Sequence, residues 1–270
     1  MKSHPIQLSL WQVALCVGLA IARAGCSLPF GLAGQGGQTA GSNWQAAVDG
    51  VAALQSGLRL PDNLQKTPSA RASTDFDVAR YFEALPRLSM EPGYVLDYVY
   101  YMDGFGGLPW LYARPAETPR YATFADWSKA NPGMKNDAYL QRVRADGTPE
   151  GYFQYVVLAM LGGEFYLYWH AAAGEIEIIA GQAALETLLA DLANPKSGKA
   201  MPAADISQAR KISVEPQVEI GAEKVTVKLI SFSRSRGFIQ NTLTFNKAFP
   251  HTIQERKQDM LIQYNWGIVY

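Results

Sequence analysis

The segment Glu164–His170 (EFYLYWH) places a histidine and a carboxylate among four aromatic side chains. In an extended strand, Tyr166, Tyr168 and His170 would share one face. His170 with Glu164 has the chemistry of a general acid or base, and the tyrosine rings suit stacking against a flat ligand or a sugar ring. The plainer interpretation is a half-buried sheet face, because tyrosine favours strands for packing alone.

Asp97 is a second catalytic candidate, because it interrupts an otherwise apolar and aromatic run, Tyr94–Met102 (YVLDYVYYM). A carboxylate among Val, Leu and Tyr must face solvent, form an ion pair or belong to a site, since an unpaired buried charge is costly. Asp103 opens the glycine-rich turn that follows (DGFGG), and turn chemistry accounts for that residue.

Two arginines, Arg234 and Arg236, lie in a short connection between two predicted strands (SRSRG). Guanidinium groups match the geometry of carboxylate and phosphate, so this turn is a candidate binding site for an anionic group. The alternative is that both arginines are simply solvated at the tip of a hairpin.

Several kinds of site are excluded by the composition. Only two of the three histidines, His170 and His251, lie beyond the N-terminal segment, so a three-histidine metal site is excluded. The chain contains no G-x-S-x-G elbow and no G-x-G-x-x-G that follows a strand and opens a helix. Lys and Arg equal Asp and Glu in number, 24 of each, which leaves no basic excess for nucleic acid. We expect no metal, no cofactor and no nucleic-acid partner.

Strand signals dominate the chain after residue 93. Tyr94–Met102 and Leu108–Ala113 flank the DGFGG turn and predict a hairpin. Tyr152–Leu161 and Glu164–His170 flank a Gly-Gly pair, which predicts a second hairpin. A strand at Glu175–Ala180 would extend it to a meander. Further strands are predicted at 217–220, 224–232, 237–245, 259–264 and 267–270.

Helical spacing of apolar residues predicts a few short helices. They cover residues 44–54, 76–85 with Asp75 as cap, 123–130 with Thr123 as cap, and 182–193. In the last of these, the leucines at 185, 188, 189 and 192 form one stripe. The fold class is therefore α+β, a largely antiparallel β-sheet with a few helices packed on one face.

The first 25 residues have the order of an export signal. A short start with Lys2 is followed by an apolar run from Leu8 to Ile21 and then by small residues. A membrane span needs about 20 apolar residues, and Arg23 ends this run early. We therefore expect export, with a buried N-terminal helix as the alternative.

Two cleavages compete at the end of this segment. Ala22-Arg23-Ala24 fits an ordinary signal peptidase, which would release a secreted protein that starts at Gly25. Ala24-Gly25-Cys26 resembles the end of the bacterial lipobox, although Arg23 stands where an aliphatic residue is usual. Either cleavage leaves one thiol, and lipidation of Cys26 would consume it. We expect a lipoprotein attached to the membrane through Cys26, in the periplasm or at the outer membrane.

Four regions follow from these signals: an export signal at 1–25, a flexible tether at 26–43, short helices and a linker at 44–90, and an α+β domain at 91–270. The tether is rich in Gly, Gln, Ser and Thr, a composition typical of a flexible coil.

Two segments, Gly93–Pro115 and Asp146–His170, resemble a family of uncharacterised bacterial exported proteins, and the likeness extends to Gly237–His251. That family has no assigned activity or catalytic residues. The resemblance implies a bacterial source and carries no chemistry over to this chain.

Two functions are compatible with the sequence. The first is a lipid-anchored envelope protein whose α+β domain binds an envelope protein or a small ligand through its aromatic sheet face. The second is a hydrolase or sugar-processing enzyme that uses His170 with Asp97 or a nearby glutamate. Convergence of these residues in one concave pocket would favour the enzyme.

Overall fold

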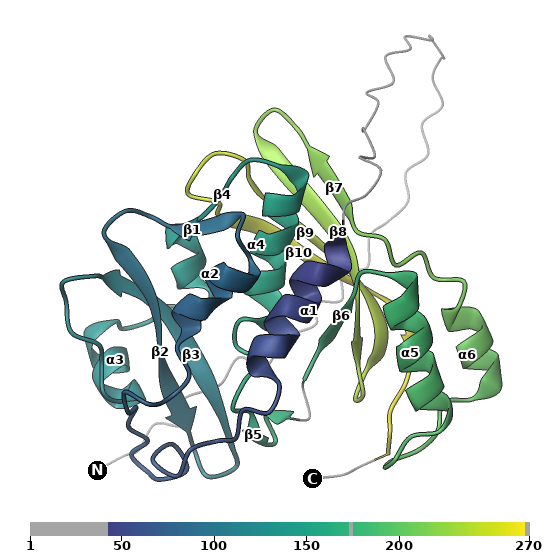
Figure 1. Ribbon diagram of the computed structural model, residues 1–270, viewed down its shortest axis with the longest axis horizontal. Helices are drawn as coiled ribbons and strands as arrows, with labels where there is room; N and C mark the ends of the chain where they lie inside the picture. Colours follow the sequence, from purple (N-terminus) through teal and green to yellow (C-terminus); the bar gives the residue numbers. More distant parts are fainter. Residues whose placement is uncertain (1–42, 173–174, 268–270) are drawn as a thin grey trace, which may run out of the picture. The chain divides into compact units, whose positions relative to one another are not determined.

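The computed structural model describes residues 43–172 and 175–267 (Figure 1). The predicted export signal, Cys26 and all but the last residue of the predicted tether lie outside the described residues. The described chain has the predicted α+β fold, in which helices pack against antiparallel sheets. None of its helices has both the length and the apolar character needed to cross a membrane.

The larger sheet is antiparallel and comes mostly from the C-terminal third of the chain. Its strands pair in the order β10-β9-β8-β6, and β7 also pairs with β8. The bounds are β6 (Glu177–Ile179), β7 (Gln217–Ile220), β8 (Lys224–Ser233), β9 (Gly237–Asn246) and β10 (Ile253–Gln263). β10 begins six residues before the predicted strand, and the predicted strand at 267–270 falls almost wholly outside the described residues.

A three-stranded sheet contains the first predicted hairpin. β2 (Tyr94–Met102) and β3 (Gly106–Pro115) pair along their full length, as the sequence predicts. β5 (Tyr168–Trp169) adds two residues to the outer edge of β3. A separate small sheet joins β1 (Leu88–Met90) to β4 (Val143–Ala145).

The second predicted hairpin is wrong, because its first half is the helix α4 (Pro149–Leu161). Thr148 caps this helix by accepting the Gly151 N–H at 3.0 Å, and Pro149 occupies the first turn. Residues 152–158 are all buried, because α4 lies between the two larger sheets (Figure 1). A helix that is apolar all round gives the same continuous run as a buried strand, so periodicity could not separate the two.

Three predicted helices are confirmed, namely α1 (Trp44–Gln55), α3 (Phe124–Ala130) and α5 (Gln182–Ala193). Thr123 caps α3 by accepting the Asp126 N–H. The four leucines of the predicted stripe in α5 are buried.

Other predicted helical regions differ from the structure. The helix expected at 76–85 is a short 3₁₀ turn, η1 (Val78–Arg80), followed by α2 (Tyr81–Ala84). Its cap is Asp77, because Asp75 is buried and accepts the Ala72 N–H instead. A second 3₁₀ turn, η2 (Ala138–Arg142), and α6 (Ala203–Ala209) were not predicted.

Two main apolar clusters hold the fold together. The first joins α1, α2, α4, the β2–β3 hairpin and the inner face of β8 and β9. The second joins α5 and α6 to the other end of the large sheet, including Phe232, Phe238 and Tyr264. β8 contributes to both clusters, so the two are built on one continuous strand.

Candidate ligand-binding pocket

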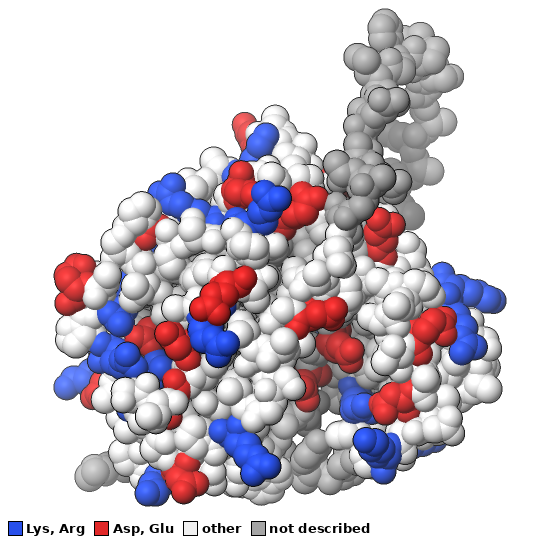
Figure 2. All heavy atoms as spheres, in the orientation of Figure 1, with Lys and Arg blue, Asp and Glu red and all other residues white. Residues whose placement is uncertain are grey.

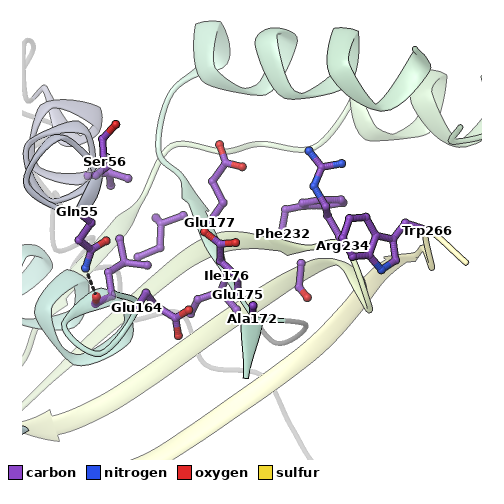
Figure 3. Close-up of a pocket in the computed structure, with 15 residues that line it drawn as sticks. Gln55, Ser56, Glu164, Ala172, Glu175, Ile176, Glu177, Phe232, Arg234 and Trp266 are labelled. Atoms are coloured by element: carbon purple, nitrogen blue, oxygen red, sulfur yellow. Dashed lines mark hydrogen bonds between the residues drawn. The ribbon is translucent and has the colours of Figure 1, made fainter. Parts of the chain in front are cut away.

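A cavity of about 570 Å³ lies between α1, the segment after α4, β6 and the end of β8 (Figure 3). Its size is that of a small-molecule site. Figure 3 shows Glu164, Glu175 and Glu177 on one side of this cavity and Arg234 with Trp266 on the other.

Hydrogen bonds between α1 and the end of α4 fix the position of Glu164. Gln55 of α1 donates from Nε2 to the carbonyl oxygen of Leu161 at 2.7 Å and to the Tyr81 hydroxyl at 2.8 Å. Tyr81 in turn donates to the carbonyl oxygen of Gly162 at 3.0 Å. Because these bonds fix the last turn of α4 and the glycines after it, the carboxyl group of Glu164 has a defined position in the cavity wall.

The carboxyl group of Glu164 is only half satisfied. The backbone amide of Ile176 donates to it. Its Oε2 atom is buried and has no hydrogen-bond partner among the described residues. A buried acceptor without a partner carries a free-energy penalty, and a bound ligand that donates a hydrogen bond or carries a positive charge would remove that penalty.

The pKa of Glu164 is raised to about 8, mainly because the side chain is buried. The hydrogen bond from Ile176 lowers the pKa, and the negative charge of the nearby Glu175 raises it. The side chain is therefore mostly protonated at pH 7. Partial burial, which removes water from around the carboxyl group, also raises the pKa of Glu177, although this side chain keeps solvent contact. Arg234 opposes that shift, while Glu175 and Asp191 add to it.

Among the described residues that line the cavity, Arg234 is the one arginine or lysine, and its charge is already balanced. Its Nη2 atom lies 2.6 Å from the Asp191 carboxylate of α5, and its guanidinium lies 5.7 Å from the Trp266 ring. Figure 2 shows acidic side chains gathered over the surface between α1 and α5. The pocket therefore has an excess of acidic groups, which favours a cation over an anion.

The structure separates the aromatic residues that the sequence places on one face. Tyr166 is buried, accepts the Phe76 N–H through its hydroxyl and has a φ of +51°, whereas Tyr168 is exposed. His170 is exposed, contacts the Trp169 ring in a tilted arrangement and does not line the cavity. The expected alternation is wrong here, because two residues with positive φ break the extended backbone.

Asp97 lies in a buried ion cluster and not in the pocket. Its carboxylate pairs with Arg71 on one oxygen and with Arg114 Nε at 2.9 Å on the other. The Arg71 guanidinium also stacks on the Tyr98 ring at 3.7 Å. Of the three alternatives expected for Asp97, namely solvent exposure, an ion pair or a functional site, the structure shows the ion pair.

The two arginines of the SRSRG turn take different directions. Arg234 enters the cavity, while Arg236 donates to Gln258 on β10 at 3.1 Å. Gln55 and Trp266 were not predicted as pocket residues, because they come from the two ends of the described chain and no local signal connects them to Glu164.

Across the described ranges, no group of three or more His, Cys, Asp and Glu side chains could hold a metal ion. The fold and the pocket define an α+β domain with an acidic cavity. No protein-family model, no curated protein and no solved structure matches the chain.

Proposed function

We propose that the chain is a lipid-anchored envelope protein of a bacterium whose α+β domain binds a small ligand with a protonated amino group. The observation that carries the ligand class is the buried Oε2 atom of Glu164. It has no hydrogen-bond partner within residues 43–172 and 175–267, and it lies in a cavity shared with Glu175 and Glu177. An ammonium group would satisfy this oxygen and compensate the acidic lining.

The rest of the lining supports the same ligand class. Arg234 is occupied by Asp191, so it offers little free charge to an anion. Trp266 presents an aromatic ring in the lining, and aromatic rings attract cations. Ser56, Ser233 and Gln55 supply neutral polar groups for the remainder of a polar ligand.

Hydrolysis of a glycoside or a related bond is the second candidate function. A carboxyl group that is protonated near neutral pH can act as a general acid, and Glu164 has the raised pKa for that role. Its partner would be Glu175 or Glu177, because His170 and Asp97 lie outside the cavity. Turnover of nitrophenyl glycosides that is lost in Glu164→Gln would establish this function in place of simple binding.

Binding of an amine is expected to release a proton from Glu164. A cation beside this carboxyl group stabilises its ionised form. At pH 7, binding of one ligand is therefore accompanied by release of a fraction of one proton from Glu164. Calorimetry with glucosamine and with cadaverine, each in two buffers of different ionisation enthalpy, measures this release. Glu164→Gln is expected to weaken binding by roughly tenfold, the effect of one lost charged hydrogen bond, and to abolish the proton release.

The matched controls are Glu186→Gln, an exposed residue of α5 that pairs with Arg210, and N-acetylglucosamine, which lacks the charge. Both the affinity and the proton count should be unchanged in Glu186→Gln. N-acetylglucosamine should release no proton, and any binding of it should be the same in wild type and Glu164→Gln. Equal affinity of wild type and Glu164→Gln for both amines would contradict the proposal.

The lipid anchor predicts a mass increment on the processed protein. Mass spectrometry of the chain isolated from bacterial membranes should show a diacylglyceryl group on an N-terminal Cys26. Cys26→Ser should lose the increment and leave the membrane fraction. A mature protein that starts at Gly25 with a free thiol would instead establish the secreted form.

A further inference from the structure

Three exposed aromatic side chains lie at the turn between β2 and β3 and on the adjacent strand β5, outside the cavity lining. Phe105, Tyr168 and Trp169 are three of the six large apolar side chains exposed in the described chain. We call these three residues the aromatic platform. They come together because β5 runs beside the start of β3 (Figure 1).

The backbone under the platform is fixed on both sides. Asp103 Oδ1 accepts the N–H groups of Phe105 and Gly106, both at 2.9 Å, which sets the tip of the turn. Trp169 pairs with Gly106 across β3 and β5, and the His170 N–H donates to the Phe105 carbonyl at 3.3 Å. The exposed rings are therefore attached to a defined scaffold.

Two of the platform rings are stacked, and the His170 ring lies tilted beside them. Phe105 and Trp169 have centroids 6.3 Å apart and planes 27° apart, and the His170 ring lies 4.7 Å from that of Trp169 at 34°. Trp169 also has a φ of +47°, a conformation that is unfavourable for a bulky residue. Strained backbone of this kind is concentrated at binding sites, where the surroundings impose it.

We propose that the aromatic platform binds a pyranose ring of a neutral oligosaccharide. A sugar ring has an apolar C–H face, which matches flat aromatic rings that are 69% exposed at Phe105 and 44% exposed at Trp169. Its hydroxyl rim needs polar partners, and the turn that carries Phe105 also carries Asp103, whose Oδ2 accepts a hydrogen bond from the Tyr101 hydroxyl at 3.3 Å.

The charge of the platform argues against a phospholipid surface. The segments 103–107 (DGFGG) and 168–170 (YWH) contain an acid and no Lys or Arg. Segments that insert into anionic membranes combine aromatic residues with basic ones.

Saturation-transfer NMR and calorimetry with chitohexaose and cellohexaose test the platform on the full-length protein. We expect binding of at least one of the two with a Kd near 1 mM, with saturation strongest at the C–H protons of the ring face. Phe105→Ala and Trp169→Gly are each expected to weaken it by up to roughly tenfold, which corresponds to the loss of one stacked ring. Met260→Ala, at an equally exposed apolar residue of β10, should bind like the wild type.

Trp169→Gly separates a binding role from a structural one. Glycine adopts positive φ without penalty, so this variant should keep its thermal midpoint to within about 3 °C while it loses the sugar. Glu164→Gln should leave sugar binding unchanged, so failure of the platform and failure of the acidic pocket are distinguishable.

Three results would overturn the proposal. The first is that neither oligosaccharide binds at about 10 mM, tenfold above the expected Kd. The second is that binding persists in both platform variants. The third is that the protein co-sediments with phosphatidylglycerol vesicles and that Phe105→Ala abolishes this co-sedimentation. The last result would assign the platform to a membrane surface.

Discussion

Glu164→Gln is expected to flatten the pH dependence of stability between pH 4.5 and pH 8. The unfolded chain has an ordinary glutamate pKa of 4.5 at this position, whereas burial raises the pKa of Glu164 in the folded protein to about 8. Between these values the folded state holds a proton that the unfolded state has lost. The free energy of unfolding therefore decreases as pH rises, by about 1.4 kcal/mol per pH unit from this group.

Partial solvent access reduces the effect, so we expect at most about 4 kcal/mol over the whole interval. Glutamine has a similar shape and does not ionise. The variant should therefore gain stability relative to the wild type as pH rises from 5 to 8. A buried amide nitrogen without an acceptor lowers the free energy of unfolding of the variant by about 1 kcal/mol at every pH. The comparison therefore uses the slope of the free energy of unfolding against pH, which this constant offset does not change.

Urea unfolding at pH 5, 6, 7 and 8 at constant ionic strength measures the slope. Glu186→Gln is the matched control, because its side chain is 45% exposed in an ion pair with Arg210 and should reproduce the wild-type curve. Parallel curves for wild type and Glu164→Gln would show that Glu164 is ionised in the folded protein, and the proposed proton release on amine binding would then be lost as well.

Asp97→Asn is expected to lower the free energy of unfolding by about 3 to 5 kcal/mol. The Asp97 carboxylate is the shared partner of Arg71 and Arg114, and the Arg71 side chain is only 4% exposed. Removing the negative charge leaves the buried guanidinium of Arg71 without compensation. A loss of this size corresponds to a decrease of about 10 °C in the thermal midpoint.

Asp259→Asn provides the comparison on the surface. Asp259 pairs with Lys257 at 2.8 Å, but both side chains are largely exposed, so its loss should cost less than about 1 kcal/mol. Calorimetric or urea unfolding of both variants at pH 7 gives the two values. A similar, small effect of the two substitutions would contradict the assignment of Asp97 to a buried structural cluster.

The elements with strong local signals were predicted from the sequence. The leucine stripe of α5, the Thr123 cap of α3 and the glycine turn between β2 and β3 each depend on neighbouring residues alone. α4 was missed because the surrounding sheets bury it on all sides, which removes the polar stripe that identifies a surface helix. The signal present was Thr148-Pro149, a cap followed by a proline in the first turn.

The candidate site was predicted only in part. Glu164 and Arg234 were among the candidates and both line the cavity, whereas Gln55 and Trp266 carried no signal. Tyr166 and Trp169 could not be placed by period-2 reasoning, because their positive φ values depend on tertiary contacts. Long-range packing therefore determines both the pocket and the aromatic platform, and a single sequence does not encode that packing in a form that can be read locally.

The cavity lining begins at Val48 in the first described helix and ends at Trp266, the next-to-last described residue. The cavity is therefore complete only when the segment around Trp266 is packed against the rest of the described domain. Binding of the proposed ligand would report on the packing of that segment. The proposed ligand would contact both α1 and the segment around Trp266, so it would stabilise their packing by an amount that grows with its concentration.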